Sequence, residues 1–519
     1  MIGEHNPGPI ATYPTISRSD HVDCYHDVDV PDPYHVFDDL QDESVRRWVS
    51  EQEALTESFL ACNADRAEYR RFLEERACHV KLGLPLSCGD WIIEFIRKAE
   101  DEQPAICARS KSGGPLKPIV DPNRLDPRGR ISIDVEHVFA SRDGELLAYN
   151  LVESGADARS IHIRDMHSGA DLPDVIPPTA EPTVAWHPEG GGFFYNVTRR
   201  LFAGPTNGGQ LDGVYWHSLG APIHEDRLAY EYHNGRGQSA LPYISPCGTY
   251  LFIKQVNYVM GRHGWLFRRL EEPDAKLAVL FDDCEAAANL IALRGALAYF
   301  DTRLDAPNGR VVLIDLGRPE RPNWRELVSE SEYSLVKSSY SVLSTKSAAG
   351  PGHIVVAYER DAHHFLRVFD LDGRCLQSVE FPEFSTVTHL RHEDGNRFLI
   401  RTDSFSSPFT IYRLDAASAS LDWVDGAAIS DPAIKCTQDF FTSDDGTRIA
   451  TYMFTSPVLA KTASAPTLLY GYGGWGQLGY AMSKAGLEPL LNILTAEYAS
   501  TGLRFFLIRP SIVETDSPN

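Results

Sequence analysis

The sequence has no long apolar run, and it is poor in basic residues. No stretch approaches the ~18 consecutive apolar residues of a membrane-spanning helix, and the opening residues lack the basic and apolar regions of a signal peptide. Lysine and arginine number 49 against 72 aspartates and glutamates, which gives a net charge of −23. So acidic a chain argues against nucleic acid or an anionic membrane as its main partner.

Paired cysteines are also absent. The nine cysteines stand singly along the chain, with no C-x-x-C pair among them. A dispersed, odd-numbered set indicates free thiols in a reducing compartment. The sequence therefore predicts a cytoplasmic protein.

No pattern of metal ligands is visible either. Five histidines occur in strand-like segments: His137, His187, His353, His363 and His364. None has a cysteine or carboxylate pattern at ligand spacing, and we interpret all five as surface or turn residues. The acidic stretches 370–374 and 443–447 lack the ligand spacing and closing glutamate of a calcium loop, which predicts hairpin turns. The sequence thus predicts neither a metal nor an organic cofactor.

Two helices are predicted near the N-terminus, after a loose extension over residues 1–30. The first lies within 32–61, where Asp42 suits an N-cap and apolar residues recur at helical spacing. Those apolar residues are Val45, Trp48, Val49, Leu55 and Phe59. The second helix covers about 65–77, with Tyr69, Phe72 and Leu73 on one face. We expect both helices to pack with the C-terminal part of the chain.

From about residue 78 the chain becomes a series of short strands rich in aromatic and β-branched residues. One unit recurs, a strand, a polar turn and an apolar strand, as in "HVFASRDGELLAYN" (137–150) and "LPYISPCGTYLFIK" (241–254). Its turns fall near seven glycines: Gly89, Gly144, Gly190, Gly248, Gly295, Gly350 and Gly395. Successive turns are 45 to 58 residues apart, and a propeller blade needs roughly 40 to 50. We therefore predict a seven-bladed β-propeller over 76–430 rather than a long β-sandwich.

The pattern changes again after residue 430. The segment 435–457 predicts a hairpin whose turn is formed by Asp444, Asp445 and Gly446. An apolar strand in "APTLLYGYGG", a helix in "GLEPLLNILTAEYASTG" and a second strand in "LRFFLIRP" follow. Strand, helix and strand in this order are the opening of an α/β sheet.

The glycine-rich turn in "PTLLYGYGGWGQ" (466–477) has two interpretations. Gly471, Gly473 and Gly476 fit the G-x-G-x-x-G spacing of a dinucleotide-binding loop. Against this, Arg509 stands where an acidic residue should close the next strand, and only 43 residues follow Gly476. That length is too short for a dinucleotide-binding domain. A loop that stabilises an oxyanion is the favoured interpretation.

Three separated segments resemble the prolyl oligopeptidase family of serine peptidases. They are "DPYHVFDDLQDESVRRWVSEQ" (32–52), "VYWHSLGAPIHEDRLAYE" (214–231) and "PTLLYGYGGWG" (466–476), in the family's order. The resemblance implies a propeller that caps an α/β-hydrolase domain, and cleavage, or transfer to an amine, of short peptides after proline. It further implies that Tyr472 donates its hydroxyl to the developing oxyanion. Trp475 is implied to line the pocket for the substrate's proline ring.

The residues that complete such an enzyme are not found in the sequence. No serine has glycine at both −2 and +2, the G-x-S-x-G elbow of an α/β-hydrolase. The resemblance ends near Arg509, ahead of the family's serine, aspartate and histidine. We therefore expect a seven-bladed propeller plus an incomplete α/β-hydrolase domain, formed by N-terminal helices (1–75) and first strands (431–519). Without a serine–histidine pair the chain as given is expected to be inactive.

Three interpretations remain open for such a chain. It is a prolyl oligopeptidase-type peptidase that lacks its C-terminal part, a non-catalytic propeller that binds peptides or a partner, or a split enzyme completed by another polypeptide. In the family's strand order, the strand 466–471 would lack its neighbour and present an unpaired edge. We therefore expect 431–519 to be the least stable part and open to capture by a protein partner, whereas the propeller folds regardless.

Overall fold

A computed structural model describes residues 13–455 of the chain, with short gaps. The gaps are 40–41, 64, 78–79, 99, 154, 157, 199–211, 233–237, 259, 337–345, 405–406, 408, 427–434, 443 and 447. The chain divides between Cys78 and His79 into two compact units, and each is described by itself.

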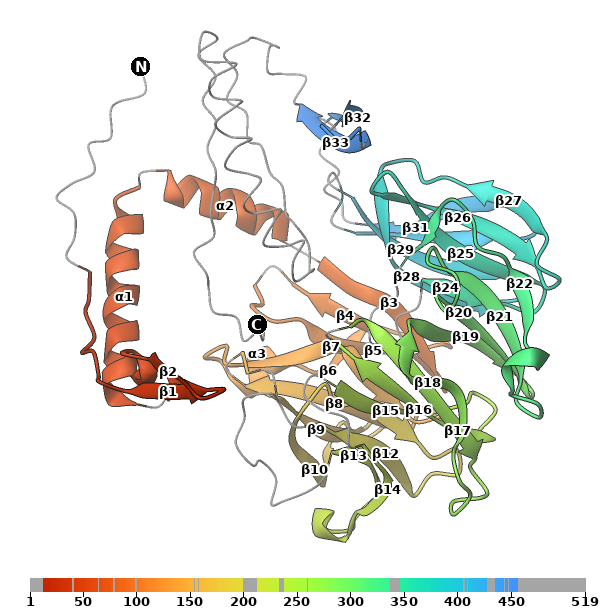
Figure 1. Cartoon of the computed structure of the whole chain (residues 1–519), viewed down its shortest axis with the longest axis horizontal. Coiled ribbons are helices and arrows are strands. Elements are labelled where there is room, and N and C mark those ends of the chain that lie inside the picture. Colours follow the sequence, from red (N-terminus) through yellow and green to blue (C-terminus); the bar gives the residue numbers. More distant parts are fainter. Residues whose placement is uncertain are drawn as a thin grey trace. The chain divides into compact units, whose positions relative to one another are not determined.

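The N-terminal unit is a β-hairpin followed by helices (Figure 1). Its elements are β1 (Val22–Tyr25), β2 (Val28–Pro31), the 3-10 helix η1 (His35–Asp38), α1 (Glu43–Ala61) and α2 (Arg66–Ala77). The hairpin turn is formed by His26 and Asp27, whose φ angles of 51° and 64° lie in the left-handed region that His and Asp tolerate better than most residues. No helix in the described part of the chain is both long and apolar enough to cross a membrane.

The predicted cap of α1 is confirmed. The Asp42 carboxylate accepts a hydrogen bond from the Ser44 backbone N–H at 2.8 Å, which satisfies one of the free donors at the helix start. On the same helix Val45 is 1% exposed. Trp48 packs edge-on against Phe37 with ring centroids 5.0 Å apart. These contacts fasten the start of α1 to the segment before it.

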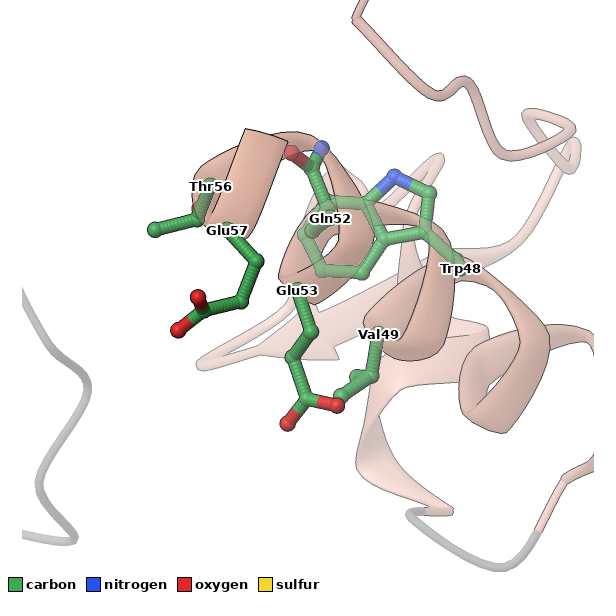
Figure 2. A pocket seen from close by; sticks show the side chains of 6 residues that line it. All are labelled: Trp48, Val49, Gln52, Glu53, Thr56 and Glu57. Carbon is green, nitrogen blue, oxygen red and sulfur yellow. The ribbon is translucent and has the colours of Figure 1, made fainter. Parts of the chain in front are cut away.

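Other apolar residues of α1 lie open. Val49 and Phe59 are 41% and 73% exposed. Figure 2 shows a hollow on this helix that is lined by Trp48, Val49, Gln52, Glu53, Thr56 and Glu57. Helical spacing thus identified the helix, but not which of its apolar residues are buried.

The second unit contains seven sheets between Val80 and Gly426, the blades of a β-propeller (Figure 1). Blade 1 has β3 (Val80–Cys88), β4 (Trp91–Arg97), β5 (Ala105–Ser110) and β6 (Lys117–Val120); blade 2 has β7 (Ile131–Ala140), β8 (Leu146–Glu153), β9 (Ala158–Asp165) and β10 (Asp171–Ala180). Blade 3 has β11 (Val184–Trp186), β12 (Gly192–Val197), β13 (Gly213–Ser218) and β14 (Arg227–Glu231); blade 4 has β15 (Gln238–Ile244), β16 (Tyr250–Asn257), β17 (Arg262–Arg269) and β18 (Ala278–Ala286).

The remaining blades repeat this antiparallel order. Blade 5 has β19 (Ala288–Arg294), β20 (Leu297–Thr302), β21 (Arg310–Asp315) and β22 (Arg325–Val328); blade 6 has β23 (Ser334–Leu335), β24 (Ser347–Ala349), β25 (His353–Arg360), β26 (His363–Asp370) and β27 (Cys375–Val379). Blade 7 has β28 (Ser385–Asp394), β29 (Arg397–Ser404), β30 (Thr410–Asp415) and β31 (Ser420–Gly426). Short helices α3 (Pro122–Leu125), η3 (Ile223–Glu225) and η4 (Arg321–Asn323) interrupt the connections.

The seven-bladed prediction is confirmed. Each predicted turn joins two neighbouring antiparallel strands at the start of its blade, from Gly89 between β3 and β4 to Gly395 between β28 and β29. In blade 6 both β23 and β24 pair with β25, which we count as the second strand, and Gly350 lies between β24 and β25. Six of the seven glycines, all but Gly350, have a positive φ, a conformation in which only glycine avoids strain. The recurring signal was therefore a backbone requirement in every blade except blade 6.

Apolar clusters lie between neighbouring blades. The cluster between blades 4 and 5 includes Trp265 and Phe300, with ring centroids 5.3 Å apart. The cluster between blades 7 and 1 includes Leu84, Leu399 and Phe409. Burial of a large apolar side chain contributes roughly 1.5–3 kcal/mol, so these clusters hold the blades face to face.

Candidate functional site at the hairpin end of the propeller

The glycine turn that the sequence marked as catalytic lies outside the described residues. Tyr472 and Trp475 both fall within 456–519. The candidate site is therefore built from the propeller and from the hairpin that precedes this turn in the sequence.

That hairpin lies on one end of blade 6. It consists of β32 (Lys435–Thr442) and β33 (Arg448–Thr455), as the sequence predicted. The Tyr452 hydroxyl donates to the main-chain carbonyl of Asp361, in the turn between β25 and β26, at 2.6 Å. Gln438 donates to the same oxygen at 3.0 Å, and Tyr452 packs edge-on against Phe384. We call this side of the propeller the hairpin end.

Buried polar side chains gather toward the hairpin end. In every blade the second strand runs antiparallel to the first and, like β25, ends on this side. Five second strands carry a buried polar residue in their second half: Asn150, Asn196, Lys254, Asp301 and Thr402. A buried polar group is costly unless it is bonded, so each of these side chains needs a hydrogen-bond partner in the propeller or in a ligand.

Blades 6 and 7 contribute a charged group near this end, which we call the Lys346 cluster. Its members are Lys346, His364, His389, Arg401 and Asp403. Lys346 precedes β24 and is 9% exposed. His389 and Arg401 are direct partners in the β28–β29 register. The Arg401 Nε lies 3.5 Å from the Asp403 carboxylate.

Both imidazoles of the Lys346 cluster are held neutral. The Nδ1 of His364 accepts a hydrogen bond from the Val387 backbone N–H at 2.8 Å, which leaves the ring proton on Nε2. Burial, with Lys346 next in effect, lowers the pKa of His364 to about 4. Burial and then Lys346 and Arg401 lower the pKa of His389 to about 3.

The pKa of Asp403, the acidic member of the cluster, shifts upward instead. Burial raises the pKa of Asp403, although Arg401 and Lys346 partly counteract it. With Lys346 and Arg401 beside two neutral imidazoles and one carboxylate, basic side chains outnumber acidic ones at this site. Such a set favours a carboxylate or the carbonyl oxygens of a peptide.

A second polar group lies between blades 4 and 5. The ammonium of Lys254 donates to Asn289 at 3.3 Å, and Asn289 donates to Asp301 at 2.8 Å. Burial lowers the pKa of Lys254 to about 7, although Asp301 acts against this shift. Burial likewise raises the pKa of Asp301. Burial thus favours the neutral form of both groups.

A third network joins blades 2 and 3, and its role is structural. His217 of β13 is 0% exposed and lies between Asp174 of β10 and Asp226, at 3.0 and 2.8 Å. Asp174 also accepts from the Gly220 backbone N–H, and Asp226 accepts from the Tyr195 hydroxyl. His217, Gly220 and Asp226 all belong to the segment 214–231. The residues that carried the resemblance there thus form one buried hydrogen-bond network.

The surface-or-turn interpretation of the histidines was wrong for three of them: His364 of the Lys346 cluster is partly buried within β26, and two others are buried in strands. His137 and His363 are each 8% exposed and lie in β7 and β26. His137 bonds to Asp134 at 2.8 Å, and the Nδ1 of His363 lies 3.3 Å from the Tyr452 hydroxyl. Strand alternation, rather than turn position, decides the burial of these residues.

Sequence reasoning also missed the members of the polar clusters. A single lysine inside the apolar run "YLFIKQV" was a usable signal for Lys254. No local signal marked Lys346, because it acts on His389 and Asp403 of the neighbouring blade.

The architecture defines the class of protein: a seven-bladed β-propeller with a C-terminal hairpin anchored on its polar end. Residues 14–425 match the family described as "Prolyl oligopeptidase, N-terminal beta-propeller domain". The chain therefore belongs to the prolyl oligopeptidase family, as its motifs predicted.

Individual relatives agree with this assignment. The chain is 22% identical to the "Prolyl endopeptidase" of Elizabethkingia meningoseptica over 95% of its own length and 67% of the relative's. It is 26% identical to "Prolyl oligopeptidase A" of Galerina marginata, with 89% and 67% covered. The chain thus spans about two thirds of these relatives.

Solved structures show the same fold. A structure from a study of two prolyl endopeptidases superimposes with a TM-score of 0.76 at 24% identity, covering 89% of this chain and 67% of that one. Prolyl oligopeptidase B from Galerina marginata, bound to a 35mer hydrolysis and macrocyclization substrate, gives a TM-score of 0.73 at 22% identity, covering 89% and 68%.

Proposed function

We propose that this chain supplies the peptide-binding propeller of a prolyl oligopeptidase-type serine peptidase. The parent reaction is cleavage, or transfer to an amine, of short peptides after proline. The names of its relatives support this proposal, since they include prolyl endopeptidases and a "Dual function macrocyclase-peptidase POPB". The observation that carries it is the contact of Tyr452 with Asp361. This contact attaches the chain just ahead of the glycine turn to the propeller's polar end.

In this proposal each part has a separate task. The Lys346 cluster attracts the carboxylate or carbonyl oxygens of an incoming peptide through fixed positive charge. Trp475 lines the pocket for the proline ring, and Tyr472 is the hydroxyl donor for the oxyanion. The propeller restricts entry to short, unfolded peptides. We also propose a cytoplasmic location, because seven of the cysteines are free thiols.

We further propose that these 519 residues bind peptides without cleaving them. The sequence offers no G-x-S-x-G serine, and Tyr472 alone cannot form an acyl-enzyme. The alternative is a non-catalytic propeller that binds peptides or a partner as its own function. A protein partner that covers the incomplete sheet suits either case.

Peptide binding and labelling of the purified chain test these proposals. A fluorescein-labelled short peptide with a central proline is titrated against the protein, beside the same peptide with alanine. We expect the proline peptide to bind ~10-fold more tightly. Trp475→Ala is expected to remove this preference. Trp423→Ala, at a residue 65% exposed on blade 7, is the matched control and leaves it unchanged.

Three outcomes would contradict the proposals. Absence of binding would refute the peptide-binding role, and equal binding of both peptides would refute the preference for proline. Covalent labelling by a fluorophosphonate probe that excess peptide suppresses would show an activated nucleophile and refute the lack of catalysis.

A further inference from the structure

Five potential metal ligands come together in the N-terminal unit, within a stretch where the sequence predicted none. They are His21, Asp23, Asp32, His35 and Asp38. The ligand atoms of His21, Asp23 and His35 all lie within 4.8 Å of one another, and so do those of Asp32, His35 and Asp38. His35 belongs to both groups and joins them into one cluster.

The hairpin register creates this arrangement. The β1–β2 ladder pairs Asp23 with Val30, and it continues where the Asp32 backbone N–H donates to the His21 carbonyl at 2.9 Å. His21 and Asp32 are therefore brought opposite each other across the hairpin. The 3-10 helix η1 then returns His35 to the same side, where its ring stacks on His21 with centroids 3.6 Å apart.

The donor atoms converge at short distances. The Nε2 of His21 lies 3.2 Å from the Asp23 carboxylate. The Nδ1 of His35 lies 3.3 Å from the carboxylate of Asp32 and 3.4 Å from that of Asp38. The Nδ1 of His35 thus faces two carboxylates. A proton or a metal ion between this nitrogen and the carboxylate oxygens is needed to make these contacts attractive.

Nearby charge favours a cation. Among the described residues, no lysine or arginine forms an ion pair with Asp23, Asp32 or Asp38. The three acids therefore concentrate negative charge that no lysine or arginine within the described residues pairs with.

We propose that His21, Asp23, Asp32 and His35 bind a divalent transition-metal ion of the Zn²⁺ type, with Asp38 as an additional oxygen ligand. Imidazole nitrogen combined with carboxylate oxygen suits Zn²⁺ and its neighbours, whereas Ca²⁺ and Mg²⁺ prefer oxygen alone. The ligands are partly exposed, from 29% for Asp23 to 75% for Asp38, so the ion can enter from solvent.

The bound ion would have a structural role. It would tie the hairpin to η1 directly ahead of α1. Trp48 of α1 already reaches this region, since it packs on Phe37 of η1 and its indole N–H donates to the Pro14 carbonyl at 3.2 Å. A metal ion that binds only the folded state adds its binding free energy to the free energy of folding. The ion would therefore stabilise the start of the N-terminal unit.

Titration of the chelator-treated full chain with Zn²⁺, in competition with a chromophoric chelator, tests the proposal. We expect one strongly bound Zn²⁺ per chain, and visible absorption of a nitrogen-ligated ion when Co²⁺ replaces it. His21→Gln and His35→Gln are each expected to weaken binding at least ~10-fold, because an imidazole ligand is lost. His26→Asn, in the turn of the same hairpin, is the matched control and retains the site.

Limited proteolysis supplies a readout independent of affinity. Zn²⁺ is expected to slow cleavage between residues 20 and 40 in the unaltered chain and in His26→Asn, but not in His35→Gln. Circular dichroism of each variant confirms that it has folded. Absence of stoichiometric binding, or binding that His21→Gln and His35→Gln leave intact, would overturn the proposal. Neither outcome depends on peptide binding by the propeller.

Discussion

The Nδ1 of His217 lies 2.8 Å from the Asp226 carboxylate in a site closed to solvent, while its Nε2 lies 3.0 Å from Asp174. Carboxylates accept hydrogen bonds and do not donate them, so both ring nitrogens must carry protons. His217 is therefore an imidazolium between two carboxylates. It links β10 of blade 2 to β13 of blade 3, and its charge state determines how firmly these blades are joined.

This network predicts a pH-dependent contribution to stability. Burial lowers the pKa of His217, but the hydrogen bonds and charges of Asp226 and Asp174 outweigh it and raise the pKa above its ordinary value. A raised folded-state pKa gives stabilisation that is complete below the unfolded value and is lost as the pH rises through the folded value. His217→Gln should therefore destabilise the protein most at acidic to neutral pH, by about 3–5 kcal/mol, because two buried carboxylates lose their cation.

Denaturant unfolding of the unaltered chain and His217→Gln across pH 6 to 9 measures this difference. His224→Gln is the control, since His224 is exposed on the same segment. The difference between the unaltered chain and His217→Gln is expected to shrink as the pH rises. A difference that stays constant or grows would mean that His217 is neutral.

Two turn glycines should differ in their tolerance of alanine. Gly89 has φ of 48°, and a Cβ there would lie only 2.0 Å from the Asp143 carbonyl oxygen of the next blade. Gly295 has φ of 56° but open space around the same position. Gly295→Ala is expected to cost about 1 kcal/mol in backbone strain alone. Gly89→Ala should cost at least twice as much, because blades 1 and 2 must also separate locally.

Thermal unfolding of both variants tests this comparison, with each folded state checked by circular dichroism. Equal losses would show that the turns of blades 1 and 2 do not touch as described.

The anchor of the hairpin predicts a local effect. Tyr452→Phe removes the hydroxyl that donates to Asp361, a bond worth about 1 kcal/mol. The ring contact with Phe384 remains. We therefore expect faster hydrogen exchange in β32 and β33, with the strands of blade 6 unchanged.

Gln438→Ala is the companion variant, because Gln438 bonds to the same carbonyl oxygen. Unchanged exchange in both variants would indicate that the hairpin is not held on the propeller by these bonds.

The sequence alone determined the repeating part of the fold. A glycine at φ > 0 and the alternation of a strand are both local requirements. Seven turns at near-regular spacing, six of them with such a glycine, therefore indicated seven blades. The Asp42 cap of α1 was equally local, because its hydrogen bond spans two residues.

The tertiary structure decided which distant residues meet. His217 bonds to Asp174, which lies in the neighbouring blade and is separated from it by 43 positions. No pattern within the segment 214–231 predicts that partner. His21 and His35 lie near each other in sequence, yet only the hairpin register stacks their rings. Backbone conformation depends on nearby residues and could therefore be predicted from the sequence. Charge clusters depend on how blades and strands align in space, so they could not be predicted.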